Sequence, residues 1–166
     1  MAAMMITRRL AVLMLLAACG RAPRFLVYSG PEVTEIRVYK AERRLELWHE
    51  DTLLRQYEIG LGQTPLGHKE YEGDSRTPEG AYTIDRRNPE SAYHLSLGIS
   101  YPNADDTARA LARGLRPGGD IFIHGRGRDH PFARGDWTAG CIAVNDDEIE
   151  EIYSMVRTAT PILILP

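Results

Sequence analysis

Apolar and polar residues alternate along much of this chain, which indicates a fold built mainly from β-strands. Because successive side chains of a strand point to opposite faces, a period of two residues is typical of a strand with one buried face. The final apolar run, from Pro161 to Leu165, has no polar position and is expected to be interior. The predicted strands are residues 35–39, 44–48, 53–61, 81–85, 121–123, 142–144 and 161–165.

The longest alternating segment covers residues 91–101. It puts one set of side chains on a predicted core face and a second set on a face toward solvent or a cleft. The core set is Tyr93, Leu95, Leu97, Ile99 and Tyr101, and the other set is His94, Ser96, Gly98 and Ser100. His94 and Ser96 are therefore candidate substrate-binding residues, although a solvent-facing position fits them equally well.

Two segments show helical rather than strand patterns. Asn103 is placed to cap a helix over residues 104–113, and Gly114 is placed to end it. Asn145 with Glu148 three residues later is a capping pattern for a second helix. The sum predicts a mainly β, β-rich α+β domain with two peripheral helices.

The N-terminal residues resemble an export signal. Arg8 and Arg9 precede an apolar run, 10–18, that is too short to span a bilayer and ends at Cys19. This layout resembles the bacterial lipoprotein signal, in which the cysteine is lipidated and becomes the mature N-terminus. We expect residues 1–18 to be a signal peptide, 19–33 a lipidated cysteine with its tether, and 34–166 the folded domain. A plain signal peptide with an incidental cysteine is the alternative.

Charge limits the classes of partner. The 166 residues include 20 basic and 23 acidic side chains, and there is no run of five or six consecutive like charges, so a nucleic-acid partner is not expected. Removing residues 1–18 takes away only two basic residues, which leaves the mature chain more acidic. The membrane attachment would then depend on acyl chains rather than on a basic surface.

The two cysteines have different expected roles. If Cys19 carries lipid, Cys141 has no disulfide partner, and a single thiol in an oxidising compartment is a candidate nucleophile. A thiol needs a base, and His124 ends a predicted strand seventeen residues earlier. Gly140, just before the cysteine, would let backbone amides approach an oxyanion. A buried, inert thiol and a structural histidine are the alternative.

The surrounding motif resembles the L,D-transpeptidase catalytic domain, or YkuD-like family. Its signature is a strand ending in His-Gly, a loop, and Ser/Thr-x-Gly-Cys followed by Ile or Val. Residues 76–80 resemble the family's Thr-Pro-x-Gly turn, and residues 88–103 and 137–149 resemble the YafK-like subgroup of murein transpeptidase-related proteins. The residues that match the signature are His124, Gly125, Thr138, Gly140, Cys141 and Ile142.

This resemblance implies a β-sandwich or barrel and a set of roles. Cys141 would be the nucleophile and His124 the proton acceptor and donor, with Gly140, Gly125 and Thr138 as oxyanion or backbone support. The substrate would be a peptidoglycan stem peptide, and a thioester would be resolved by an amine or by water. No metal or cofactor is implied. The location would be the cell envelope, facing the periplasm and favouring the outer membrane, since no aspartate follows Cys19.

Two positions depart from the family pattern. Many members have histidine before Gly-Cys and arginine two residues after the cysteine, where this chain has Ala139 and Ala143. Hydrolysis is therefore an alternative to cross-linking, as an amidase or L,D-carboxypeptidase, or by release of a protein linked to peptidoglycan. A non-catalytic peptidoglycan-binding lipoprotein is a further alternative.

The remaining candidate residues near the motif have alternative interpretations. Arg126 and Arg128, in the loop before Cys141, would meet a substrate carboxylate or simply face solvent. Trp137 fits either a substrate wall or the core. His130 with His124 and Cys141 matches no usual zinc spacing, so no metal site is predicted.

Overall fold

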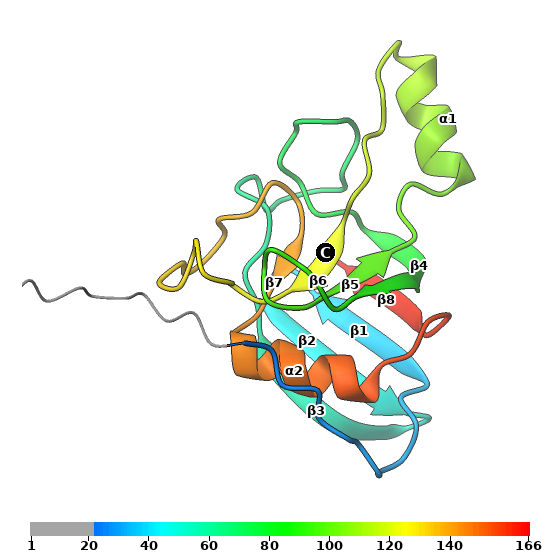
Figure 1. Cartoon of the computed structure of the whole chain (residues 1–166). Helices are drawn as coiled ribbons and strands as arrows, with labels where there is room; N and C mark the ends of the chain where they lie inside the picture. The colour runs from blue at the N-terminus through cyan, green and yellow to red at the C-terminus, as the bar shows by residue number, and fades with distance from the viewer. Residues whose placement is uncertain (1–21) are drawn as a thin grey trace, which may run out of the picture.

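In the computed structural model, residues 22–166 are described and form a curled eight-stranded sheet with two helices (Figure 1). The mainly β fold class and its two helices are confirmed. The strands, in chain order, are β1 (Glu35–Tyr39), β2 (Arg44–His49), β3 (Thr52–Glu58), β4 (Gly80–Asn88), β5 (Ser96–Ile99), β6 (Phe122–His124), β7 (Ile142–Ala143) and β8 (Pro161–Leu165).

The order of strands across the sheet is β3-β2-β1-β8-β4-β5-β6-β7. The β1–β8 and β6–β7 pairs are parallel and the others are antiparallel. The predicted interior strand 161–165 is β8, which joins the two halves of the sheet. Both its neighbours are strands and Ile162 and Ile164 are buried, but Leu163 and Leu165 are half-buried and Pro161 is exposed, so only one face of the strand is interior.

The two edges of the sheet meet. Gly60 and Gly62, just after edge strand β3, form bridges to Ala143 in edge strand β7 and to Thr138 before it. Gly60 and Ala143 exchange two backbone hydrogen bonds of 2.8 Å each. The sheet therefore curls on itself around the core, and residues 60–62 support the segment that carries Cys141.

Both helices start as predicted. α1 (Ala104–Ala112) is capped by Asn103, whose side chain accepts from the Asp106 amide at 2.9 Å. α2 (Asp146–Met155) begins where Glu148 accepts from the Asn145 amide at 2.8 Å. The apolar side of α2 is fully buried at Ile149 and Ile152, whereas α1 lies beyond one end of the sheet (Figure 1).

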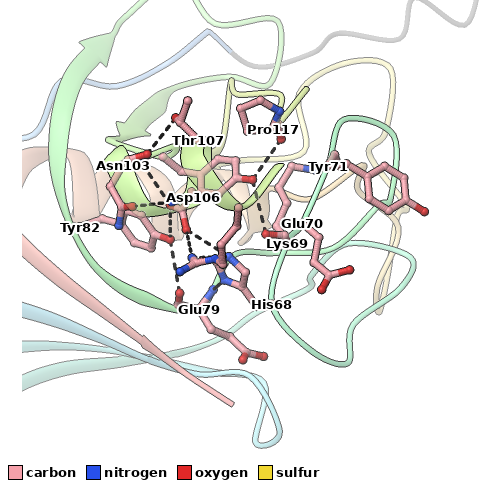
Figure 2. A network of polar contacts seen from close by, with 12 residues as sticks. His68, Lys69, Glu70, Tyr71, Glu79, Tyr82, Asn103, Asp106, Thr107 and Pro117 are labelled. Carbon is pink, nitrogen blue, oxygen red and sulfur yellow. Dashed lines mark hydrogen bonds and ion pairs between the residues drawn. The ribbon is translucent and has the colours of Figure 1, made fainter. Parts of the chain in front are cut away.

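A buried carboxylate joins α1 to the loop between β3 and β4 (Figure 2). The side chain of Asp106 is 1% exposed and accepts from the Tyr82 hydroxyl at 2.9 Å. It also lies 3.1 Å from His68 Nε2, while His68 Nδ1 accepts from the Glu79 amide at 3.0 Å. Because Nδ1 is an acceptor, the proton of the neutral ring is on Nε2, which lies beside the Asp106 carboxylate. The network holds the Thr-Pro-Glu-Gly turn beside the Cys141 segment.

The alternation predicted for residues 91–101 is wrong at its N-terminal half. The strand covers only Ser96–Ile99, and its residues are buried on both faces because α2 packs against β5 and β6. His94 has a left-handed backbone with φ of 76°, which interrupts the alternation of faces before the strand begins.

The predicted tether is partly docked onto α2. Arg24 donates through its backbone amide and its Nε to Glu150, both at 2.8 Å, and the Phe25 ring packs edge-on against Tyr153. In Figure 1 this blue segment runs along α2. The predicted signal peptide and Cys19 lie outside the described residues. Within residues 22–166 no helix is long and apolar enough to cross a membrane.

Candidate active site

Cys141 and His124 line one cavity of about 370 Å³, on the same side of the sheet. The parallel strands β6 and β7 are in register at Ile123 with Ile142 and at His124 with Ala143. His124 therefore ends one strand while Cys141 stands at the start of its neighbour. Ser96 pairs with His124 across β5 and β6 and lines the same cavity. The fold thus brings together three residues singled out in the sequence.

His124 is held as a neutral base. Its ring is buried, and Nδ1 lies 2.6 Å from the Gly125 carbonyl oxygen. Since a carbonyl only accepts, Nδ1 carries the proton and Nε2 is left as the acceptor. Burial lowers the pKa of His124 from its ordinary value, because the charged imidazolium is poorly solvated there. The Gly125 carbonyl therefore orients the His124 imidazole.

The thiol of Cys141 is protonated at neutral pH. Burial raises the pKa of Cys141 to about 11, and the nearby Asp120 carboxylate adds to the increase. A hydrogen bond from the Phe122 backbone favours the thiolate but is outweighed. The Sγ atom donates to the Asp120 carbonyl at 3.5 Å. Any nucleophilic attack must therefore be coupled to removal of the thiol proton by a base.

A short turn positions the cysteine. The Gly140 amide donates to Thr138 Oγ1 at 3.1 Å, and this hydroxyl donates to the Cys141 carbonyl at 2.7 Å. Gly140 has a φ of 135°, and a Cβ there would lie 2.7 Å from the Arg76 carbonyl oxygen. Only glycine fits this backbone and this close approach. Thr138 and Gly140 thus shape the loop on which the thiol is carried.

The two glycines predicted to support an oxyanion have bonded amides. The Gly140 amide donates to Thr138, and the Gly125 amide donates to the Leu95 carbonyl at 3.3 Å. A Cβ at Gly125 would lie 2.5 Å from Asp146 Oδ1. The structure therefore explains both glycines by close packing, and neither offers a free N–H in this conformation.

His94 is separated from this cavity. Its Nε2 lies 3.0 Å from Glu150 on α2, and both side chains are almost fully buried. The prediction that His94 shares a cleft face with Ser96 is therefore not matched by the geometry. The left-handed backbone at His94 turns its side chain to the helix. Its role here is to fix α2 against the sheet.

Arg126 and Trp137 line a second cavity, of about 310 Å³, together with Ala143. Trp137 is only half-buried, and its ring meets the His124 ring edge-on at 5.7 Å between centroids. Trp137 therefore lines the second cavity and also contacts His124. Among residues 22–166, no three or more His, Cys, Asp or Glu side chains are grouped to hold a metal ion.

No pattern in the sequence predicted the aromatic stack over His124. Tyr93 was expected in the core, yet it is 37% exposed and stacks on His124 with 4.4 Å between ring centroids. The ring of His130 also stacks with Tyr93, with 5.7 Å between centroids, and its centroid lies 4.7 Å from that of Trp137. The neighbouring His130 also contributes to the lowered pKa of His124. The alternating pattern placed Tyr93 in the core. The turn at His94 places it at the cavity instead.

Comparison with known proteins identifies relatives of this domain. The model of the L,D-transpeptidase catalytic domain family, YkuD, matches residues 34–164. "Putative L,D-transpeptidase YafK" of Escherichia coli K12 is 32% identical over 131 residues, which are 75% of this chain and 47% of the relative. The chain thus spans about half the length of the curated relatives it matches.

Solved structures with the same fold include the helical cell shape determining protein Pgp2 of Campylobacter jejuni. It superposes with a TM-score of 0.63 at 26% identity, covering 87% of this chain and 51% of Pgp2. An L,D-transpeptidase of Mycobacterium smegmatis superposes with a TM-score of 0.54 at 12% identity, covering 81% of this chain and 59% of the other. The latter likeness concerns the fold alone.

Proposed function

The chain belongs to the YkuD family of L,D-transpeptidase catalytic domains, and from this membership we propose that it is a cysteine-dependent acyltransferase acting on peptidoglycan stem peptides. The observation that carries the proposal is the shared cavity of Cys141 and His124, with the histidine fixed by the Gly125 carbonyl so that Nε2 is a free acceptor. A purely binding protein has no need of a protonated thiol beside a neutral, oriented imidazole.

The proposed reaction begins with the Cys141 thiol. Its sulfur attacks the carbonyl of the third stem residue while His124 Nε2 takes the thiol proton, so that a C–S bond forms and the carbonyl becomes an oxyanion. The C–N bond then breaks, and the imidazolium returns the proton to the departing amine of the terminal D-alanine. A thioester on Cys141 remains. An amine of a second stem or a water molecule resolves it, with His124 taking up and returning the proton again.

Water is the second candidate acceptor. Ala143 lies on β7 where many family members have arginine, so a cation that would support the thiolate or hold a carboxylate is missing from that strand. The enzyme would then act as an L,D-carboxypeptidase or an amidase, including on proteins attached to the stem. Digests of intact sacculi, analysed for 3–3 cross-links and for trimmed stems, separate the two outcomes.

Mass spectrometry of the intact protein tests the catalytic proposal. After incubation with a stem tetrapeptide or a carbapenem, we expect an adduct on Cys141 in the wild type and none in Cys141→Ala. His124→Ala should form the adduct about 10²- to 10⁴-fold more slowly, because the general base is lost. Circular dichroism of each variant checks that the fold is intact. If the wild type and Cys141→Ala bind the tetrapeptide with equal affinity and the wild type forms no adduct on Cys141, the result would instead support a receptor.

The proposed location is the periplasmic face of the envelope, anchored by lipid on Cys19 and favouring the outer membrane. The support is the layout of residues 8–19 in the sequence. Metabolic labelling with radioactive palmitate is expected to label the wild type and not Cys19→Ser. Labelling that persists in Cys19→Ser would contradict this assignment.

A further inference from the structure

Unpaired arginines gather on the loop between β6 and β7, drawn in gold in Figure 1. Across residues 22–166, most arginine side chains donate to a carboxylate or a backbone carbonyl. Within that part of the chain, no hydrogen bond or ion pair holds the guanidinium groups of Arg126, Arg128, Arg134 and Arg157. Three of these four therefore lie on one short loop, next to the candidate active site.

Two of the loop arginines line the second cavity. Arg126 and Arg134 contribute to its wall together with Trp137 and Ala143. Its volume of about 310 Å³ is at the lower end of the range of ligand sites, enough for part of a peptide. Arg128 does not line it and instead borders a separate cavity.

The charge of this cavity is positive. Arg43 also lines it, but Asp136 neutralises Arg43 through an ion pair of 2.7 Å. Glu58 is the remaining acidic residue of the wall, and its charge offsets one of the two charges of Arg126 and Arg134. The two unpaired guanidinium groups therefore leave a net positive charge, which favours an anionic ligand.

The cavity adjoins the reacting groups. Ala143 is the register partner of His124 in β6, so their side chains lie on the same face of the sheet. Cys141 is two residues earlier in the chain, a span of about 7 Å along a strand. Trp137 lines the cavity and meets the His124 ring at its edge. A group bound there would lie about two residues of extended chain from the thiol.

We infer that Arg126 and Arg134 form a carboxylate-binding subsite for the stem peptide. The planar guanidinium group pairs with both oxygens of a carboxylate, which orients the ligand as well as attracting it. The loop would thereby supply the cation that β7 lacks at Ala143. The identity of the ligand rests on the proposed function, whereas the anion preference rests on the cavity itself. The terminal carboxylate offers the required chemistry, and so does the side-chain carboxylate of the third residue where that residue is a diamino diacid.

Calorimetry in the unreactive Cys141→Ala background tests the subsite. The probes are a stem tetrapeptide, the same peptide with its terminal carboxylate amidated, and the same peptide with the carboxylate of the third residue's side chain amidated. Combining Arg126→Gln with Arg134→Gln should weaken binding of the unmodified peptide about 10- to 100-fold. Arg128→Gln, on the same loop but outside the cavity, is the matched control and should bind as the parent does.

The amidated peptides identify the carboxylate. The amidated peptide that lacks the recognised carboxylate should bind the parent protein weakly, with the affinity that the unmodified peptide has for the double variant. Its own affinity should be the same for the parent protein and the double variant. The inference is overturned if the double variant binds like Arg128→Gln, or if neither amidation weakens binding. Charge-dependent binding without acylation of Cys141 in the otherwise unmodified protein would support the subsite and contradict the proposed reaction. If Cys141 is acylated equally fast with and without the Arg126→Gln and Arg134→Gln substitutions, the subsite is contradicted and the proposed reaction is not.

Discussion

Iodoacetamide should alkylate Cys141 about tenfold more slowly than an exposed cysteine near pH 7. Burial raises the pKa of Cys141 from 9.0 to about 11, so the thiolate is about 100-fold scarcer at neutral pH. A thiolate of higher pKa is a stronger nucleophile, and a Brønsted coefficient of about 0.4–0.5 recovers roughly six- to tenfold of that loss. The remaining deficit is about tenfold.

The pH profile is the sharper measurement. Because the pKa of Cys141 is raised, the alkylation rate should rise about tenfold per pH unit from 7 to 10, whereas a short cysteine peptide should level off near pH 9. Mass spectrometry of samples quenched at fixed times gives the rates. For the peptide substrate, activity should fall only below the ordinary pKa of histidine, about 6.5, because burial lowers the pKa of His124.

A plateau of the alkylation rate at or below pH 7 would refute this reasoning. It would mean that a thiolate–imidazolium pair already exists in the resting enzyme, as in cysteine enzymes whose thiol pKa is depressed. The same experiment on His124→Ala is the control. If neutral His124 does not stabilise the resting thiolate, this variant should keep the steep profile while losing activity on the peptide.

Three substitutions test the supporting structure. Gly140→Ala would bring a Cβ against the Arg76 carbonyl at a left-handed backbone position, and we expect a loss of about 1–3 kcal/mol of stability in urea denaturation, with loss of activity. Thr138→Val should lower kcat by removing the hydroxyl that bonds the Cys141 carbonyl, whereas Thr138→Ser should retain most of it. Asp106→Asn should lower the free energy of unfolding by about 2 kcal/mol, because donors around the buried carboxylate lose their charged acceptor; an unchanged melting temperature would contradict this.

Local patterns in the sequence predicted much of the fold. Asn103 and Asn145 precede the two helices as expected, because a cap depends on residues within one turn of the chain. The apolar sequence of residues 161–165 predicted an interior strand, and β8 does lie between two other strands, although only Ile162 and Ile164 are fully buried. The pairing of His124 with Cys141 came from the spacing of a known motif.

Other parts of the site depend on contacts that no local pattern encodes. A single left-handed residue, His94, places Tyr93 over the base and buries the histidine against Glu150 on α2. The conformation of His94 depends on its contact with α2, which lies about fifty residues later in the chain. The cavity around Arg126 likewise forms only because the loop after β6 folds back beside β7.

The position of β8 has a consequence for biosynthesis. It follows every other strand of the sheet in chain order, yet it lies between β1 and β4 and joins the two halves of the sheet. Without residues 161–165, the ribbons β1–β3 and β4–β7 meet only through the bridges of Gly60 and Gly62, and the core lacks Ile162 and Ile164. Pairing over such a separation in sequence is intrinsically slow. The growing polypeptide should therefore stay incompletely folded until β8 emerges, a state in which it can still be threaded through a narrow channel.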